Sequence, residues 1–158
     1  MPVPFEGPPD ERAGLALFLD EQRAALLRKL DGLTDEHAMQ RPVRSAFCML
    51  TLVKHVAFVE RRWFQLEVAR RDIPGLWPPP DDRERRLEPG DTVATITALY
   101  TAVIEENRAI LASVDELDSC SETGVNRRWV LLHLIEEVAR HAGHADILRE
   151  EIDGLTGP

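Results

Sequence analysis

Apolar residues recur at helical spacing in four long stretches of the chain, and this pattern predicts four long helices. The first helix is expected over about residues 10–32, with Asp10 as its N-cap and Gly32 as its C-terminal stop. The second is expected over about residues 48–71, because no Gly or Pro interrupts the helical repeat of Leu, Val and Trp there. Between these two helices, a short turn can begin at Thr34.

A proline-rich segment, 74–90, separates the second helix from the third. It contains a tryptophan, three consecutive prolines and a run of charges, so it cannot continue a helix and resembles a long crossover loop. The third helix is expected to be capped by Asp91 or Thr92, and the fourth to extend over about residues 127–152, with Gly154 placed to stop it. The expected fold is an all-α four-helix bundle with one long crossover connection.

Length and charge restrict the organisation and the partners of the chain. A chain of 158 residues suits a single hydrophobic core, so one domain over residues 1–158 is expected. The 19 basic and 28 acidic residues give a formal net charge of −9, which repels phosphate backbones. The composition therefore argues against nucleic acid as a partner and leaves a small-molecule substrate as the expectation.

The sequence also predicts a cytoplasmic location. The N-terminal residues lack the basic and apolar regions of a secretion signal, and no stretch approaches the ~18 to 20 apolar residues of a membrane span. Cys48 and Cys120 show no CxxC spacing and are too few for a disulfide framework. We expect no membrane partner, and we expect both cysteines to be ordinary reduced thiols.

Ionisable side chains interrupt the inward face of the fourth predicted helix. On a helical wheel of about 100° per residue, four apolar residues define this face: Val130, Leu134, Ala145 and Leu148. Glu137, His141 and His144 fall on the same face. Burying a carboxylate beside imidazoles is costly unless each charge and each lone pair has a partner, and a bound cation would provide one.

Glu137 and His141 are four residues apart, so their side chains can converge on one divalent ion. The second predicted helix supplies a third candidate ligand, His55, at the edge of its buried face. Two His and one Glu leave coordination positions open, as in catalytic zinc sites, whereas structural zinc sites usually have four protein ligands. Zinc is the first candidate, and nickel, iron and manganese accept the same ligand types.

Two of the three other histidines have alternative roles. His144 follows His141 by three residues and can be a ligand, a residue that orients a ligand, or a general base; we favour the orienting role. His133, one turn before Glu137, is either a ligand or a helix-face residue that touches solvent at the bundle end. His37 lies in a connection and is expected to play no part.

Several other kinds of catalytic machinery are missing from the sequence. No Glu has a His three residues later, so the paired Glu-x-x-His motifs of ferritin-like di-iron sites are absent. The zincin HExxH motif, GxGxxG, the phosphate-binding loop, GxSxG and CxxC are also absent. The metal site is therefore the one chemical feature that the sequence indicates.

Two segments, TLVKHVAFVERRWF (51–64) and RWVLLHLIEEVARHAGHADILRE (128–150), resemble the DinB-like superfamily, in particular its actinobacterial branch related to mycothiol-dependent enzymes. The resemblance implies a metal-binding four-helix bundle, often a homodimer. It also implies that His55, Glu137 and His141 are the metal ligands. The chain is similar to the mycothiol-dependent isomerases in having Glu at position 137, whereas many relatives have His there.

The resemblance further implies a divalent-metal-dependent enzyme that transfers a low-molecular-weight, mycothiol-like thiol to a small electrophile. Isomerases of this branch usually carry an additional C-terminal domain, so transfer is expected rather than isomerisation. Two alternatives use the same residues. One is a non-catalytic metal-binding or sensing bundle, and the other is a hydrolase that activates a metal-bound water.

Overall fold

The computed structural model describes residues 7–8, 10–74 and 83–156. The tryptophan and prolines of the predicted crossover, at 77–80, lie outside these residues. The elements in chain order are α1 (Glu11–Arg28), α2 (Asp35–Ala38), α3 (Met49–Trp63), a π-helical turn (Phe64–Val68), a 3-10 turn (Arg83–Arg85), α4 (Val93–Ala112) and α5 (Arg127–Asp153). The described residues contain no strand, and no described helix has the length and apolar character needed to cross a membrane. The expected all-α class is confirmed.

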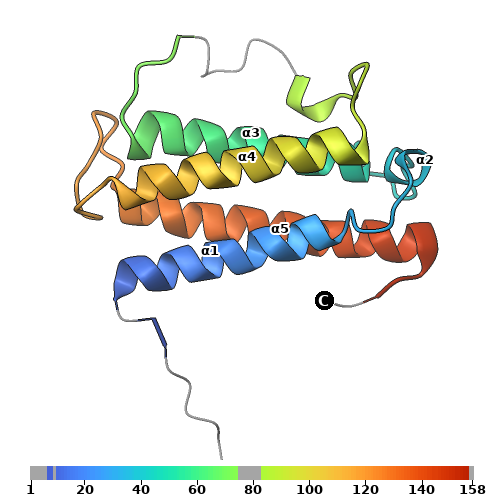
Figure 1. The fold of residues 1–158 in the computed structure, drawn as a ribbon, viewed down its shortest axis with the longest axis horizontal. Coiled ribbons are helices and arrows are strands. Elements are labelled where there is room, and N and C mark those ends of the chain that lie inside the picture. The colour runs from blue at the N-terminus through green and yellow to red at the C-terminus, as the bar shows by residue number, and fades with distance from the viewer. Residues whose placement is uncertain (1–6, 9, 75–82, 157–158) are drawn as a thin grey trace, which may run out of the picture.

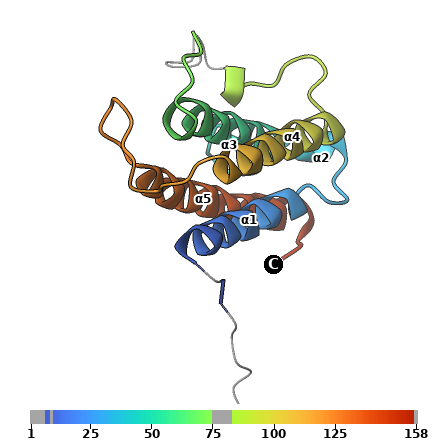
Figure 2. The same ribbon diagram turned by 60° about the vertical axis from the view of Figure 1, so that its left-hand side comes forward.

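The four long helices form two layers, α3 with α4 and α1 with α5 (Figures 1 and 2). The layers meet where α3 packs against α5. Figure 1 shows that α3 and α4 run in the same direction, opposite to α1 and α5. The chain between α3 and α4 therefore returns along the bundle, as the predicted long crossover requires.

Local capping fixes most helix ends where the sequence predicted them. The Asp10 side chain accepts a hydrogen bond from the Ala13 amide, and Asn126 caps α5 in the same way through the Trp129 amide, both over 2.8 Å. Gly154 ends α5 with a φ of 75°. The short turn at Thr34 is confirmed as α2, which Thr34 caps. The first helix ends earlier than predicted, at Arg28, and irregular turns continue to residue 32.

The prediction of the second helix is correct up to its last turns. After Trp63 it continues as a π-helical turn to Val68, three residues short of the predicted end. Arg70 then adopts a φ of 53°, and the Arg71 amide bonds to the Gln65 carbonyl over 2.9 Å. This is the geometry of a helix stop that usually uses glycine. Because arginine occupies the left-handed position here, the sequence carries no visible stop signal.

A buried polar cluster joins α1, α3 and α4 at the centre of the bundle. Glu60 is fully buried and accepts hydrogen bonds from Arg23 Nε over 2.9 Å, from the Tyr100 hydroxyl over 2.5 Å and from Asn107 Nδ2 over 3.3 Å. A carboxylate in such a position requires several donors, because its desolvation is costly. The cluster fixes how three helices meet.

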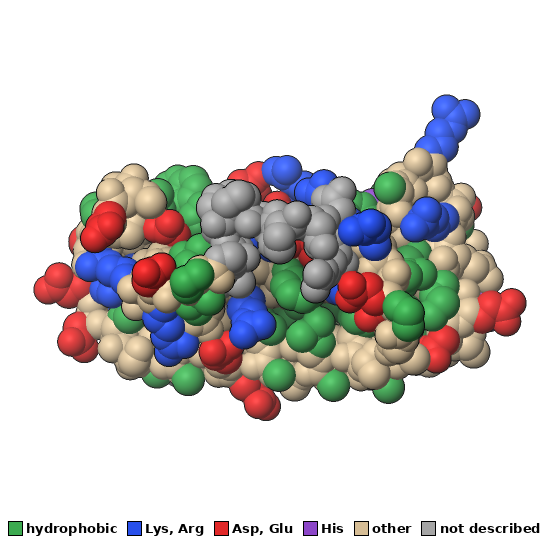
Figure 3. Space-filling model, turned by 90° about the horizontal axis from the view of Figure 1, so that it is seen from above, with side chains coloured by type: hydrophobic (Ala, Val, Ile, Leu, Met, Phe, Trp, Pro, Cys, Tyr) green, Lys and Arg blue, Asp and Glu red, His purple; other side chains and the backbone are tan. Residues whose placement is uncertain are grey.

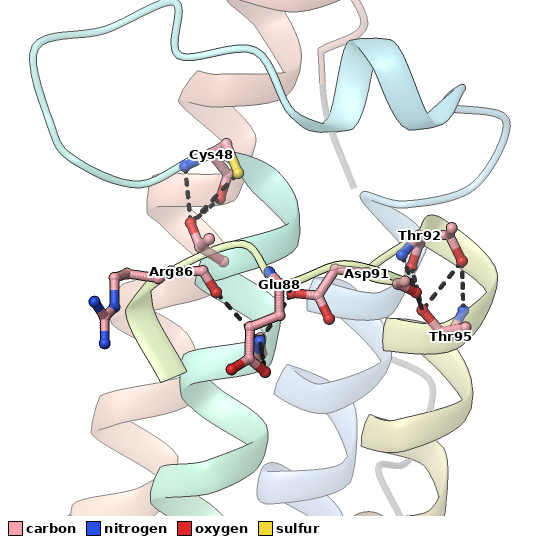
Figure 4. Close-up of polar contacts among 9 residues, drawn as sticks. Cys48, Arg86, Glu88, Asp91, Thr92 and Thr95 are labelled. Carbon is pink, nitrogen blue, oxygen red and sulfur yellow. Dashed lines mark hydrogen bonds and ion pairs between the residues drawn. The ribbon is translucent and has the colours of Figure 1, made fainter. Parts of the chain in front are cut away.

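The returning end of the crossover is attached to α3 by Lys54, which is 3% exposed. Its ammonium group lies 3.2 Å from the Arg86 carbonyl, 3.2 Å from Glu88 Oε2 and 2.8 Å from Asp91 Oδ2. The three acceptors gather beside α3 in Figure 4.

On the surface, the face seen from above carries acidic and basic side chains interspersed, with no large area of one sign (Figure 3).

Candidate metal centre

Two antiparallel helices bring together the three predicted ligands. His55 projects from α3, and Glu137 and His141 project from successive turns of α5. Glu137 Oε1 lies 3.1 Å from His141 Nε2 and 3.8 Å from His55 Nε2. One donor atom from each residue lies within 4.8 Å of the other two, and this is the group of His, Cys, Asp and Glu that could hold an ion among the described residues.

The donor set fits a divalent cation. Ligand atoms about 2.0–2.1 Å from a tetrahedral zinc ion lie about 3.3 Å apart, and the separations of 3.1 Å and 3.8 Å from Glu137 Oε1 to the two imidazoles are close to this value. The hydrogen bond with His141, followed by the nearby imidazole of His55, holds the pKa of the Glu137 carboxyl well below its usual range. Glu137 is therefore ionised at neutral pH, which is the form that binds a cation. Three protein donors leave a position for water or a substrate.

The second nitrogen of His55 has a carboxylate partner that the sequence analysis missed. His55 Nδ1 lies 3.0 Å from Glu84 Oε1 on the returning crossover segment, and Arg62 forms an ion pair with the same carboxylate. Burial opposes ionisation of Glu84, but the hydrogen bond and charge of Arg62, together with His55, outweigh it and lower the pKa. Glu84 therefore presents an ionised acceptor to His55.

An aromatic side chain lies beside the two candidate histidine ligands and His144. Phe47, just before α3, has its ring centroid 5.6 Å from that of His55, 5.9 Å from that of His141 and 6.0 Å from that of His144. Its apolar ring limits the access of water to the imidazoles on this side. The sequence analysis did not identify Phe47, because a lone aromatic residue in a connection gives no chemical signal.

A protein-family model described as Mycothiol-S-transferase matches residues 14–154. The chain belongs to the mycothiol S-transferase family. A crystal structure of a conserved protein from Enterococcus faecalis superposes with a TM-score of 0.65 at 17% identity, over 89% of this chain and 96% of the other. That likeness shows the shared bundle fold alone. No curated protein matches the sequence. The predicted helical bundle and its relation to mycothiol-dependent enzymes are thus confirmed, and the three predicted ligands form a group that could hold a metal ion.

The other histidines of this mycothiol S-transferase family member lie outside the converging group. His144 Nε2 lies 3.2 Å from Ser45 Oγ, and burial, followed by the proximity of His141, lowers the pKa of His144. His133 stacks on Trp129 and meets the edge of Trp63, with centroid distances of 5.1 Å and 4.9 Å. His37 lies in α2 and is exposed.

Proposed function

We propose that this protein is a divalent-metal-dependent enzyme that transfers mycothiol to a small electrophile. The observation that carries the proposal is the convergence of three donors, from His55, Glu137 and His141, in a chain of the mycothiol S-transferase family. Zinc is the first candidate ion because two imidazoles and a carboxylate suit it, and nickel, iron or manganese are the alternatives.

In this proposal, His55, Glu137 and His141 hold the ion. When bound, the ion supplies acidity to a coordinated thiol, which favours the nucleophilic thiolate at neutral pH. In the proposed transfer, a carbon–sulfur bond forms, the bond between carbon and the leaving group breaks, and the thiol proton is released. The contribution of the chain is to hold both reactants close together and to limit water, for which the ring of Phe47 is suitably placed.

We propose an orienting role for His144. Its imidazole and the Ser45 hydroxyl form a polar pair next to Phe47, so they can orient a group that approaches the open side of the metal centre. The lowered pKa of His144 favours the neutral ring, which can accept a hydrogen bond.

The test is thiol consumption and thioether formation, followed by mass spectrometry, with metal-loaded protein, mycothiol and an alkyl halide. We expect acceleration over the uncatalysed reaction, lost in His141→Ala and Glu137→Gln. The controls are His37→Ala, at an exposed residue of α2, and Glu136→Gln, which removes the exposed carboxylate beside Glu137. Glutathione and bacillithiol in parallel reactions report thiol specificity.

Two outcomes would overturn the proposal. If the protein binds metal but no thiol perturbs the visible spectrum of its cobalt form, the protein is a non-catalytic metal-binding bundle. If an ester or amide is hydrolysed without thiol, metal-activated water is the nucleophile and the protein is a hydrolase.

We also propose a homodimer in the cytoplasm. Exposed large apolar side chains support self-association: Leu17 and Phe18 on α1 are 44% and 56% exposed, and Leu132 and Ile147 on α5 are 51% and 54% exposed. The reduced thiol that the reaction consumes is available in the cytoplasm. Light scattering after size exclusion tests the dimer, and a mass of one chain would exclude it.

A further inference from the structure

We propose that Glu84 and Lys54 are positioning residues of the metal centre. In this proposal, Lys54 fixes the returning crossover segment on α3, and the attached segment places Glu84 where it orients the imidazole of His55. The inference rests on the metal site of the proposed function, but not on the thiol or on the transfer reaction.

The contact between Glu84 and His55 fixes one ring nitrogen. A carboxylate held ionised by Arg62 can only accept hydrogen bonds, so His55 Nδ1 must carry the proton in the 3.0 Å contact with Glu84. The other nitrogen, Nε2, then keeps its lone pair on the side of Glu137. A hydrogen bond of this kind commonly sets the tautomer and the ring orientation of a metal-binding histidine.

Glu84 cannot hold this position by itself, because it lies in a short 3-10 turn outside the four long helices. It is nevertheless 7% exposed, so the segment that carries it must be held closely against α3. Arg62 binds its carboxylate from one side. The attachment on the other side begins two residues later, at the Arg86 carbonyl.

Lys54 provides this attachment through all three of its donors. Its ammonium group, next to His55 in the sequence, meets the Arg86 carbonyl, Glu88 and Asp91, and Asp91 Oδ2 also accepts a hydrogen bond of 2.8 Å from the Glu88 amide. A buried ammonium with three acceptors on one short segment differs from an exposed ion pair, because its partners cannot move away without leaving a buried charge. One turn of α3 thus holds both the ligand and the anchor of the residue that orients the ligand.

The test is metal affinity, measured for the full chain by competition with a chromophoric chelator in the absence of any thiol. We expect Glu84→Ala to lower the affinity about 10- to 100-fold, and Glu84→Gln, which keeps an acceptor oxygen, to lower it less. We expect Lys54→Met, which acts through Glu84, to lower the affinity about tenfold, at the small end of that range. Lys54→Arg keeps a cation and should recover most of the loss.

The matched control is Lys29→Met. Lys29, at the end of α1, is the other lysine of the chain, is 5% exposed and pairs with Asp146 at 2.5 Å. This variant should lose stability without losing metal affinity. Circular dichroism establishes that each variant is folded, and Arg62→Met tests the support of Glu84 by a second route if Lys54→Met does not fold.

Two further readouts separate positioning from general loosening of the bundle. The visible bands of the cobalt form should change in Glu84→Ala and not in Lys29→Met, because only the first alters the ligand geometry. Nitrogen NMR of the zinc form should show His55 protonated at Nδ1 in the wild type. Variants at Glu84 and Lys54 that bind metal like the wild type would overturn this inference alone, whereas a wild type that binds no metal would overturn both the inference and the proposed metal centre.

Discussion

The Tyr100 hydroxyl donates a hydrogen bond of 2.5 Å to Oε1 of Glu60, and both side chains are fully buried at the centre of the bundle. Burial, followed by the charge of Glu60, raises the pKa of Tyr100 well above its usual value of 10. The folded protein therefore holds the phenol proton more tightly than the unfolded chain does. This difference connects the alkaline stability of the bundle to a single residue.

We predict that Tyr100 makes the protein less stable at high pH. A raised pKa in the folded state contributes stability that is fully present below the unfolded pKa near 10 and is lost as pH rises toward the folded pKa. Tyr100 is the only tyrosine in the sequence, so tyrosinate absorbance reports it directly. The absorbance should appear together with unfolding rather than near pH 10, and Tyr100→Phe should flatten the stability profile above that pH. A normal titration in the folded protein would refute this.

A second prediction concerns the buried ion pair of the same cluster. Arg23→Met leaves the Glu60 carboxylate without its main cationic partner and should lower the free energy of unfolding by about 3–5 kcal/mol. Urea denaturation measures the change. Arg108→Met removes an exposed arginine that pairs with Asp20 and should cost about 0–1 kcal/mol. Equal effects of the two substitutions would show that burial of the first pair has no energetic consequence.

A third prediction is that removal of metal destabilises the protein. An ion that binds only the folded state adds about 2.7 kcal/mol when its free concentration is 100 times its Kd. The melting temperature should therefore fall on chelation, and Glu137→Gln should reduce the difference. Affinity should also decrease as pH falls, because protons compete with the ion for the imidazole nitrogens. Identical melting curves with and without chelator, in samples of verified metal content, would contradict the metal site.

The fourth prediction tests the role of His144. His144→Ala should lower the transfer rate about 10- to 100-fold while most of the metal stays bound, because its imidazole pairs with Ser45 and lies outside the converging donors. Elemental analysis and rate measurements on the same samples provide the comparison. His133→Ala, which disturbs a tryptophan stack elsewhere on α5, should leave the rate unchanged. Loss of metal from His144→Ala would instead make His144 a ligand.

Helix identity and most helix ends followed from the sequence, because the signals that fix them are local. Asp10, Asn126 and Gly154 act on neighbouring backbone groups, so their effect can be read from a few residues. The end of the second helix at Arg70 could not be predicted in this way. A left-handed arginine is favoured only by the contacts of the folded chain, which a local pattern does not contain.

The candidate site, too, could be predicted only where the signal lies within one helix. The spacing of Glu137 and His141 along one helix predicts that they meet, and one face of α3 supplies His55. Glu84 could not be found, because it lies within a run of charged residues and only the path of the crossover makes it different from them. Lys54 and Glu60 were missed for a related reason, since each finds its partners on elements far away in the sequence.

The candidate metal ligands are separated by about half of the 158 residues, with His55 on α3 and the other two on α5. During synthesis, the ribosome releases α3 long before the rest of the site exists. Contacts between such distant residues form late, because closing a long loop costs entropy before any contact compensates for it. In the proposed function, the ion would therefore bind after much of the bundle has formed, unlike the ion of a zinc finger, which folds its own site. Cells short of the metal would then hold a less stable, metal-free bundle, so metal supply would affect the abundance of the protein as well as the proposed activity.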